Sequence, residues 1–317
     1  MTKFDHYGVV VTPDDFVGAD WIELCKKYKL RTLGLHSGGG AVADVLKMLG
    51  RYGTSDFRAK AAEAGLECEY ECHAAGSLIQ PSNFEQHPEY FAFDPRRGQR
   101  RNDSNWCVTN PAAQDLYYQN AQMLIKSLES ATHRYMLWNV DVPRIYCHCP
   151  DCSRLSPSDQ ALMAVNLLAR AARKVDPKAV VPYLAYYELM EPPTTVEPEP
   201  NVFLEFAPYT RCYLHALDDT NCATNREVFA KLKRLLEFFP ANSAHVLEYY
   251  LDSSFFSYYK RPAVEVRPLR DVMKRDFDCY ASLGIRSLTT FAVYLDGEYF
   301  RMYGEQGLAD YSEMLLS

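Results

Sequence analysis

Short apolar runs recur along the whole chain, and amphipathic or polar stretches separate them. Eight of these runs have the length of a strand and are apolar almost throughout. Such runs are typical of parallel strands whose two faces are both buried. We therefore predict eight strands, at Tyr7–Val11, Arg31–His36, Leu66–His73, Tyr135–Asn139, Val180–Tyr186, Val202–Phe206, Ala244–Tyr250 and Ser287–Val293.

Helical periodicity occupies most of the intervals between these strands. The clearest case is Ser158–Val175, where apolar residues recur with the spacing of one helix face. Eight strands that alternate with helices favour a closed (β/α)₈ TIM barrel over an open sheet, and no break in composition divides residues 1–317 into two domains. Further helices are expected at Asp20–Cys25, after a Gly38–Gly40 turn, at Ala112–Leu128, Asn225–Phe239 and Leu269–Leu283, and from Gln306 onward.

Two connections differ from the rest. Residues 74–110 have little periodicity, so we expect a long loop between the third strand and the third helix, and long loops in compact domains are often functional. The proline-rich segment Glu191–Pro200 is expected to be a stiff connection between strands five and six.

The composition narrows the range of partners. With 41 acidic and 34 basic residues the net charge is -7, which argues against nucleic acid, because binding a phosphate backbone requires concentrated Lys and Arg. The 23 Tyr and 16 Phe offer stacking faces that suit a carbohydrate ligand. We see neither a signal peptide nor an apolar stretch of about 20 residues, so we expect a cytoplasmic protein with no membrane partner. The sequence does not decide whether the protein forms a homo-oligomer.

The carboxylates at the strand ends are the first candidates for chemistry. In a TIM barrel the active site lies at the C-terminal ends of the strands, and glycosidic cleavage typically uses two carboxyl groups. Asp141, Glu188 and Glu248 end or follow strands four, five and seven, and we predict that they are catalytic. Which one is the general acid stays undecided, and each could instead be an ordinary rim carboxylate paired with a basic residue.

Other polar and aromatic residues gather at the same strand ends. A neutral imidazole could bond a sugar hydroxyl and an aromatic ring could stack on a pyranose, although the same side chains also serve as core residues. The predicted substrate-binding residues are His36, His73, Trp138, Asn139, Tyr186, Tyr209, Arg211, Tyr250, Asp252 and Phe291.

Three cysteines lie within one short segment of the sequence. Cys147, Cys149 and Cys152 are close enough in sequence for their thiolates to share one zinc ion. A structural zinc site needs a fourth ligand, and no second CxxC supplies one. We therefore favour a buried or disulfide-capable thiol cluster over a structural zinc site, and we expect that catalysis requires no metal or other cofactor. The fourth ligand of a zinc site would have to be His148, Cys212 or Cys222.

Several motifs carry a resemblance to known families. His87–Ala92 and Trp106–Pro111 look like a region of carbohydrate-active barrels that include α-glucuronidase-like enzymes. Over residues 85–300 the chain is similar to the domain-of-unknown-function family 4838, which is associated with glycoside hydrolase family 163, the endo-β-N-acetylglucosaminidases. The motifs behind this similarity are Asn139–Cys152 with Asn166, Leu184–Tyr186 before Pro192 and Pro193, Arg211–Tyr213, and Asn221 and Cys222 with Asn225.

This resemblance implies a (β/α)₈ barrel that hydrolyses a β-linked N-acetylglucosaminide, with the acetamide of the substrate as a candidate nucleophile. Asp141 falls on the acidic position before the cysteines of the family, and Glu248 falls in its strand-seven patch. The chain departs from the family pattern at Val142, where a Gly is expected, and at His148, where relatives often have Glu.

Three hypotheses follow for the function. The leading one is a glycoside hydrolase that cleaves an oligosaccharide or glycan by carboxylate acid/base catalysis. The alternatives are a catalytically silent sugar-binding barrel and a metal-dependent hydrolase that uses the Cys147–Cys152 loop.

Overall fold

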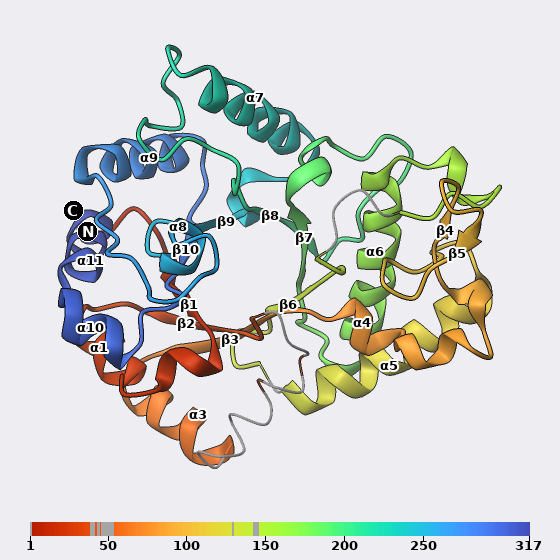
Figure 1. Ribbon diagram of the computed structural model, residues 1–317, viewed down its shortest axis with the longest axis horizontal. Helices are drawn as coiled ribbons and strands as arrows, with labels where there is room; N and C mark the ends of the chain where they lie inside the picture. The colour runs from red at the N-terminus through yellow and green to blue at the C-terminus, as the bar shows by residue number, and fades with distance from the viewer. Residues whose placement is uncertain (1, 39–41, 43–44, 46–53, 129, 142–145) are drawn as a thin grey trace.

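Eight parallel strands form a closed barrel around the centre of the molecule (Figure 1). The computed structural model describes residues 2–38, 42, 45, 54–128, 130–141 and 146–317. Most of the predicted turn at Gly38–Gly40 and of the helical segment after it lies outside these residues. The barrel strands are β1 (His6–Val11), β2 (Thr32–His36), β3 (Glu67–His73), β6 (Tyr135–Trp138), β7 (Val181–Ala185), β8 (Val202–Phe206), β9 (His245–Glu248) and β10 (Ser287–Phe291).

The strands follow one another around the barrel in chain order. The sheet runs β6-β3-β2-β1-β10-β9-β8-β7, with every neighbouring pair parallel. A parallel bridge between Arg134 and Val180 joins its two edges, where the Tyr135 amide donates to the Val180 carbonyl oxygen at 3.1 Å. This closure confirms the predicted TIM barrel.

Side chains along each strand face alternately the surrounding helices and the barrel interior. Val9 and Val11 of β1 belong to the large core shared with the helices, whereas Val10 belongs to a smaller cluster with Trp138 and Phe291. The large apolar core therefore lies between the barrel and the helices, and the smaller cluster lies among inward-facing residues.

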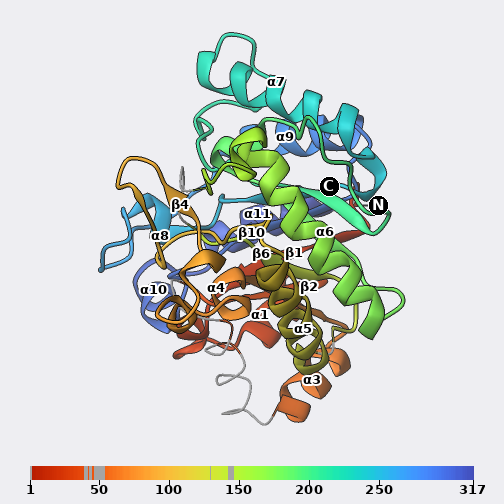
Figure 2. The same ribbon diagram turned by 90° about the vertical axis from the view of Figure 1, so that its right-hand side faces the viewer.

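Helices surround the barrel in both views (Figures 1 and 2). No helix in the described part of the chain is long and apolar enough to span a membrane. The longer helices are α1 (Trp21–Lys27), α3 (Thr54–Glu63), α5 (Pro111–Leu128), α6 (Pro157–Val175), α7 (Ala223–Phe238), α9 (Arg270–Ser282), α10 (Gly297–Tyr303) and α11 (Gln306–Leu316); α4 (Ala75–Leu78) and α8 (Ser253–Phe256) are single turns.

The connection between β7 and β8 contains the proline-rich segment that the sequence predicts between strands five and six. It contains only a 3₁₀ turn, Tyr187–Met190, followed by the proline-rich segment, and α6 packs on both β7 and β8. The Asp159 carboxylate in the first turn of α6 accepts hydrogen bonds from three consecutive amides, those of residues 194–196, at 2.8–3.1 Å. The buried side chain of Asp159 thus fixes this connection, whose described residues form no α-helix.

The long loop over residues 74–110 is ordered by local structure. It contains α4, two 3₁₀ turns and a hairpin of β4 (Phe93–Asp94) and β5 (Gln99–Arg100). Asp94 is almost fully buried and pairs with Arg96 and Arg101 at 3.1 and 3.0 Å. The prediction of a long insertion is confirmed, and the insertion itself is compact.

Gly8 offers a test of how tightly neighbouring strands pack. A Cβ atom at this position would overlap the backbone carbonyl of Thr32 on β2. We expect Gly8→Ala to lower the stability by about 1–3 kcal/mol, the usual cost of overpacking a core, and hence to lower the thermal midpoint. Gly76→Ala is the control, because nothing lies within 4 Å of its Cβ position. Equal midpoints for the two variants would contradict the tight approach of β1 and β2.

Candidate active site

A cavity of about 740 Å³ opens at the C-terminal ends of the barrel strands, a volume typical of small-ligand sites. Every strand contributes to its lining, through residues that end or follow the strand. Examples in strand order are Thr12, His36, His73, Trp138, Tyr186, Tyr209, Leu247 and Phe291. A smaller cavity adjoins it, since His73, Trp138, Asp141, Leu184 and Tyr186 line both.

Most of the predicted site residues meet here. Asn139 and Glu188 line the smaller cavity. Among the described lining residues, neither cavity includes Glu248, Arg211 or Tyr250. The predicted residues that line the main cavity are His36, His73, Trp138, Asp141, Tyr186, Tyr209, Asp252 and Phe291.

Trp138 lies at the centre of an aromatic group in the main cavity. Its ring centroid is 5.0 Å from that of His73 and 5.5 Å from that of His36, and Phe291 lies 5.2 Å from His36. The Trp138 indole N–H donates to Glu205 Oε2 at 2.7 Å, and burial raises the pKa of Glu205 to about 8. The indole is therefore fixed from inside the barrel while its ring faces the cavity.

The two histidines present neutral imidazoles. His36 Nδ1 lies 2.5 Å from the Glu71 carbonyl oxygen, and His73 Nδ1 lies 2.6 Å from the Asn139 carbonyl oxygen. Because a carbonyl only accepts, each Nδ1 carries the hydrogen, and each Nε2 is left as an acceptor. Burial lowers the pKa of His36 to about 3 and also lowers that of His73, although Asp141 opposes the latter shift. Each ring can therefore accept a hydrogen bond from a ligand hydroxyl.

One wall of the cavity is a continuous row of aromatic rings. Successive centroid distances are 5.2 Å from Phe291 to Tyr249, 5.4 Å from Tyr249 to Tyr209, and 5.6 Å from Tyr209 to Tyr186. Sequence reasoning missed Tyr249 and chose Tyr250 instead. In the structure Tyr249 shares the inward face with Leu247, two residues earlier, but the sequence carries no signal that distinguishes this face from the outward one.

Three tyrosines at the mouth have left-handed backbone conformations. The φ angles are 50° at Tyr187, 59° at Tyr259 and 70° at Tyr294, a region that bulky residues rarely occupy. Tyr259 and Tyr294 line the main cavity and Tyr187 lines the smaller one. Such strain costs about 1–3 kcal/mol per residue and concentrates at functional sites, so its position supports a ligand site here.

The carboxylates of the main cavity have different environments. Three carboxylates among the described residues line this cavity: Asp14 and Asp141 are exposed, whereas Asp252 is 4% exposed. Asp252 Oδ1 accepts hydrogen bonds from Ser254 Oγ at 2.5 Å and from the Phe255 amide at 3.0 Å, and Oδ2 takes part in neither. Burial raises the pKa of Asp252 to about 6 despite these bonds. The cavity thus combines one buried carboxyl group, that of Asp252, with the exposed carboxyl groups of Asp14 and Asp141.

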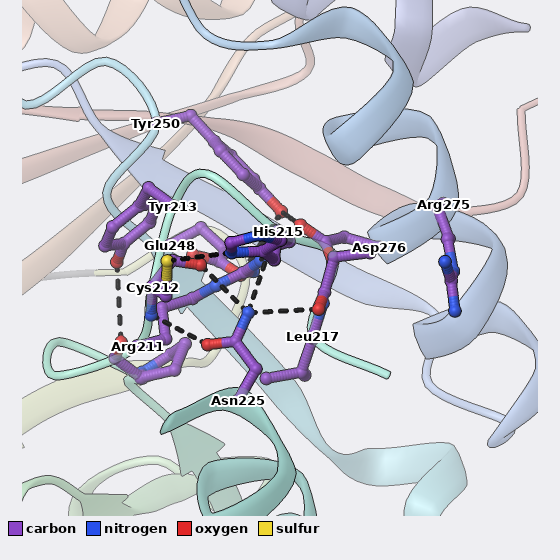
Figure 3. A network of polar contacts seen from close by, with 12 residues as sticks. Arg211, Cys212, Tyr213, His215, Leu217, Asn225, Glu248, Tyr250, Arg275 and Asp276 are labelled. Carbon is purple, nitrogen blue, oxygen red and sulfur yellow. Dashed lines mark hydrogen bonds and ion pairs between the residues drawn. The ribbon is translucent and has the colours of Figure 1, made fainter. Parts of the chain in front are cut away.

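Glu248, by contrast, belongs to a buried ion cluster outside the barrel wall (Figure 3). Its Oε1 lies 2.7 Å from Arg211 Nη1 and accepts from the Tyr280 hydroxyl, while Arg211 Nη2 lies 2.7 Å from Asp276 Oδ2. The Tyr250 hydroxyl donates to the same Asp276 oxygen at 2.8 Å. Burial, reinforced by Glu248, raises the pKa of Asp276 to about 6, although Arg211 opposes the shift.

Two expectations are therefore corrected. The three predicted carboxylates do not converge, because Glu248 faces α9 rather than the barrel interior, and Arg211 and Tyr250 contact this cluster rather than the cavity. The physical reason is the alternation along β9, which sends Leu247 and Tyr249 inward and the residues next to them outward. The cluster joins the β8–α7 connection to β9 and α9.

Two groups of side chains in the described residues could hold a metal ion. One consists of Cys107, Cys147, Cys149 and Cys152, and the other of Cys212, His215 and Cys222. The cysteine at position 107 was missed, and none of the three predicted fourth ligands joins the first group. None of the four thiols is among the described lining residues of the two cavities.

The chain belongs to the family described as a domain of unknown function, DUF4838, whose profile matches residues 48–308. The comparison with curated proteins finds no match.

Solved structures with a similar fold include several glycoside hydrolases. The exo-β-1,4-mannosidase Op5Man5 from Opitutaceae bacterium strain TAV5 is 12% identical, with a TM-score of 0.51, and the match covers 90% of this chain and 52% of that one. A β-galactosidase from Halorubrum lacusprofundi is 10% identical, with a TM-score of 0.55 and coverages of 98% and 57%. Endo-glycoceramidase II from Rhodococcus sp. is 10% identical, with a TM-score of 0.51 and coverages of 91% and 73%. The chain spans little more than half of the first two, and these likenesses establish the fold.

Removing the cation of the buried ion cluster should destabilise the protein strongly. Arg211→Leu leaves the buried Glu248 and Asp276 carboxylates without their cation, which typically costs about 3–5 kcal/mol. Arg270→Leu is a matched control, because Arg270 also pairs with two carboxylates, those of Asp310 and Glu313, but is 40% exposed and should cost less than about 1 kcal/mol. Chemical denaturation of both variants measures the difference, and similar losses would contradict a structural role for the cluster.

Asp252 predicts a pH dependence of stability. Its folded pKa of about 6 lies above the ordinary 3.8, so the folded state holds the proton more tightly and loses stability as the pH rises from about 4 through about 6. Asp252→Asn keeps an oxygen that can begin α8 but cannot ionise. We expect the wild type to lose on the order of 3 kcal/mol relative to this variant over that range.

Thermal midpoints at pH 4, 5, 6 and 7 test this expectation, with the exposed Asp115→Asn as the control variant. A constant difference between the wild type and Asp252→Asn would show that Asp252 ionises as it does in the unfolded chain.

Proposed function

We propose that this protein is a glycoside hydrolase that cleaves an oligosaccharide or glycan in the main cavity. The observation that carries the proposal is that carboxyl groups, among them Asp141 and Asp252, and an aromatic wall line one cavity at the C-terminal end of a TIM barrel. Aromatic faces stack on pyranose rings, and the neutral His36 and His73 supply hydrogen-bond acceptors for sugar hydroxyls.

The two carboxyl groups suit different tasks. A general acid must hold a proton near the working pH, and the buried Asp252 meets this requirement with a pKa of about 6. The exposed Asp141 then stabilises the positive charge that develops on the sugar ring, or orients an N-acetyl group. Glu188, which lines the adjoining cavity beside Asp141, is the alternative acid.

The proposed substrate class rests on the resemblance of the sequence motifs to glycoside hydrolase family 163. This resemblance to endo-β-N-acetylglucosaminidases implies a β-linked N-acetylglucosaminide as the substrate. The glycoside hydrolases of the same fold support carbohydrate chemistry on this barrel, although they act on different sugars according to their names. The cysteine loop takes no part in the reaction, because its thiols are buried outside the described lining of the cavity.

Activity measurements test the proposal. A panel of aryl β-glycosides that includes the N-acetylglucosaminide, together with N-glycans, is assayed for release of the aglycone or of a shortened glycan. Hydrolysis of an N-acetylglucosaminide supports the full proposal. Binding of these sugars without turnover would instead identify a catalytically silent sugar-binding barrel.

Single amide substitutions then assign the catalytic groups. Because general acid catalysis is commonly worth about 10² to 10⁴ in rate, Asp252→Asn and Asp141→Asn should each lower kcat by at least about 100-fold. Glu188→Gln tests the alternative acid, and the exposed Glu237→Gln on α7 is the control.

With Asp252 as the acid, kcat/KM declines as the pH rises above about 6, because the carboxyl loses its proton. Unchanged kcat in both Asp variants would reject the assignment.

A further inference from the structure

We propose that Cys107, Cys147, Cys149 and Cys152 bind one Zn²⁺ ion in a closed tetrahedral site. One ligand comes from the long loop before α5, and the other three come from the connection between β6 and α6. The inference does not depend on the proposed glycosidase activity, because it rests on the positions of these four side chains alone.

The distances between the sulfur atoms fit a single tetrahedral ion. All four atoms lie within 4.8 Å of one another, and Cys107 Sγ is 3.7 Å from Cys149 Sγ and 3.8 Å from Cys152 Sγ. A zinc ion with Zn–S bonds of about 2.3 Å places its sulfurs about 3.8 Å apart. A disulfide would bring two of them to about 2.05 Å, and all four cysteines are free thiols.

The surroundings of the thiols also suit a metal site. All four cysteines are buried, with Cys147 and Cys152 at 0% exposure, so their thiolate charges would need a cation. The Phe93 amide donates to Cys147 Sγ at 3.4 Å, and Thr109 Oγ1 lies 3.1 Å from Cys152 Sγ. Donors of this kind commonly surround metal-bound thiolates and orient them.

The site would fasten three elements together. Cys107 lies just before α5, and the hairpin of β4 and β5 approaches through Phe93, whose carbonyl oxygen accepts the His148 amide at 3.0 Å. On the other side, the Gln160 side chain of α6 donates to the carbonyl oxygens of Cys147 and Cys152 at 3.0 and 3.2 Å. Tyr146, next to Cys147, lines the smaller cavity. The ion would therefore brace one side of the cavity from outside.

Four thiolates leave a zinc ion no open position, which makes the site structural rather than catalytic. The second group, Cys212, His215 and Cys222, has only three members, all partly or largely exposed. A cysteine variant in this second group therefore serves as a matched control, because the proposal places no zinc ion there.

Metal content is measured on protein purified without a histidine tag from cells grown with added zinc. We expect about one zinc per chain in the wild type and in Cys222→Ser, and close to none in Cys107→Ser. Absence of zinc from the wild type, iron in its place, or equal zinc in Cys107→Ser and the wild type would each overturn the proposal.

Measurements on the wild type keep the test decisive if Cys107→Ser fails to fold. X-ray absorption at the zinc edge should show four sulfur neighbours at about 2.3 Å. Thiol titration in denaturant with a chelator should find all 10 cysteines reduced, whereas a disulfide located by peptide mapping among Cys107, Cys147, Cys149 and Cys152 would contradict the site. Chelation should also lower the thermal midpoint, because bound metal stabilises the folded state.

Discussion

Closure of the parallel barrel is the constraint on which the rest of the structure depends. Once the Arg134–Val180 bridge joins the two edges, every strand has one face toward the interior and one toward the helices. All eight strands then end at one mouth, so residues far apart in sequence, such as His36 and Phe291, come into ring contact. The same closure sends alternate residues of β9 either to the cavity or to the ion cluster behind the wall, so that neighbouring residues have unrelated roles.

The sequence was sufficient to predict the barrel, and most of the site residues predicted from it lie at the two cavities. Apolar runs mark buried strands, and the strand order of a barrel follows from strict parallel connections, so His73, Trp138 and Asp252 could be placed at the mouth. The orientation of a strand that is buried on both faces could not be predicted in the same way. Such a strand lacks the polar alternation that would distinguish its faces, and for this reason Glu248 and Tyr250 were assigned to the wrong side of β9.

Contacts between loops that are distant in sequence could not be predicted either. Cys147, Cys149 and Cys152 are visible as a motif because they are adjacent in sequence, but Cys107 lies 40 residues earlier in a segment without periodicity. Only the folding of the 74–110 insertion against the connection between β6 and α6 brings it to the other three. The compact hairpin around Asp94 could not be foreseen either, because its pairing with Arg101 depends on a turn rather than on a repeating pattern.

The single carboxylate of Asp159 limits how the two segments bonded to it can move. It begins α6 through Ser156 and also accepts the amides of residues 194–196, so the start of that helix and the chain beyond Glu188 share one buried anchor. If either segment moved alone, the buried Asp159 carboxylate would lose several hydrogen bonds that water could not replace. The start of α6 and residues 194–196 are therefore expected to open only together, as one unit of local unfolding.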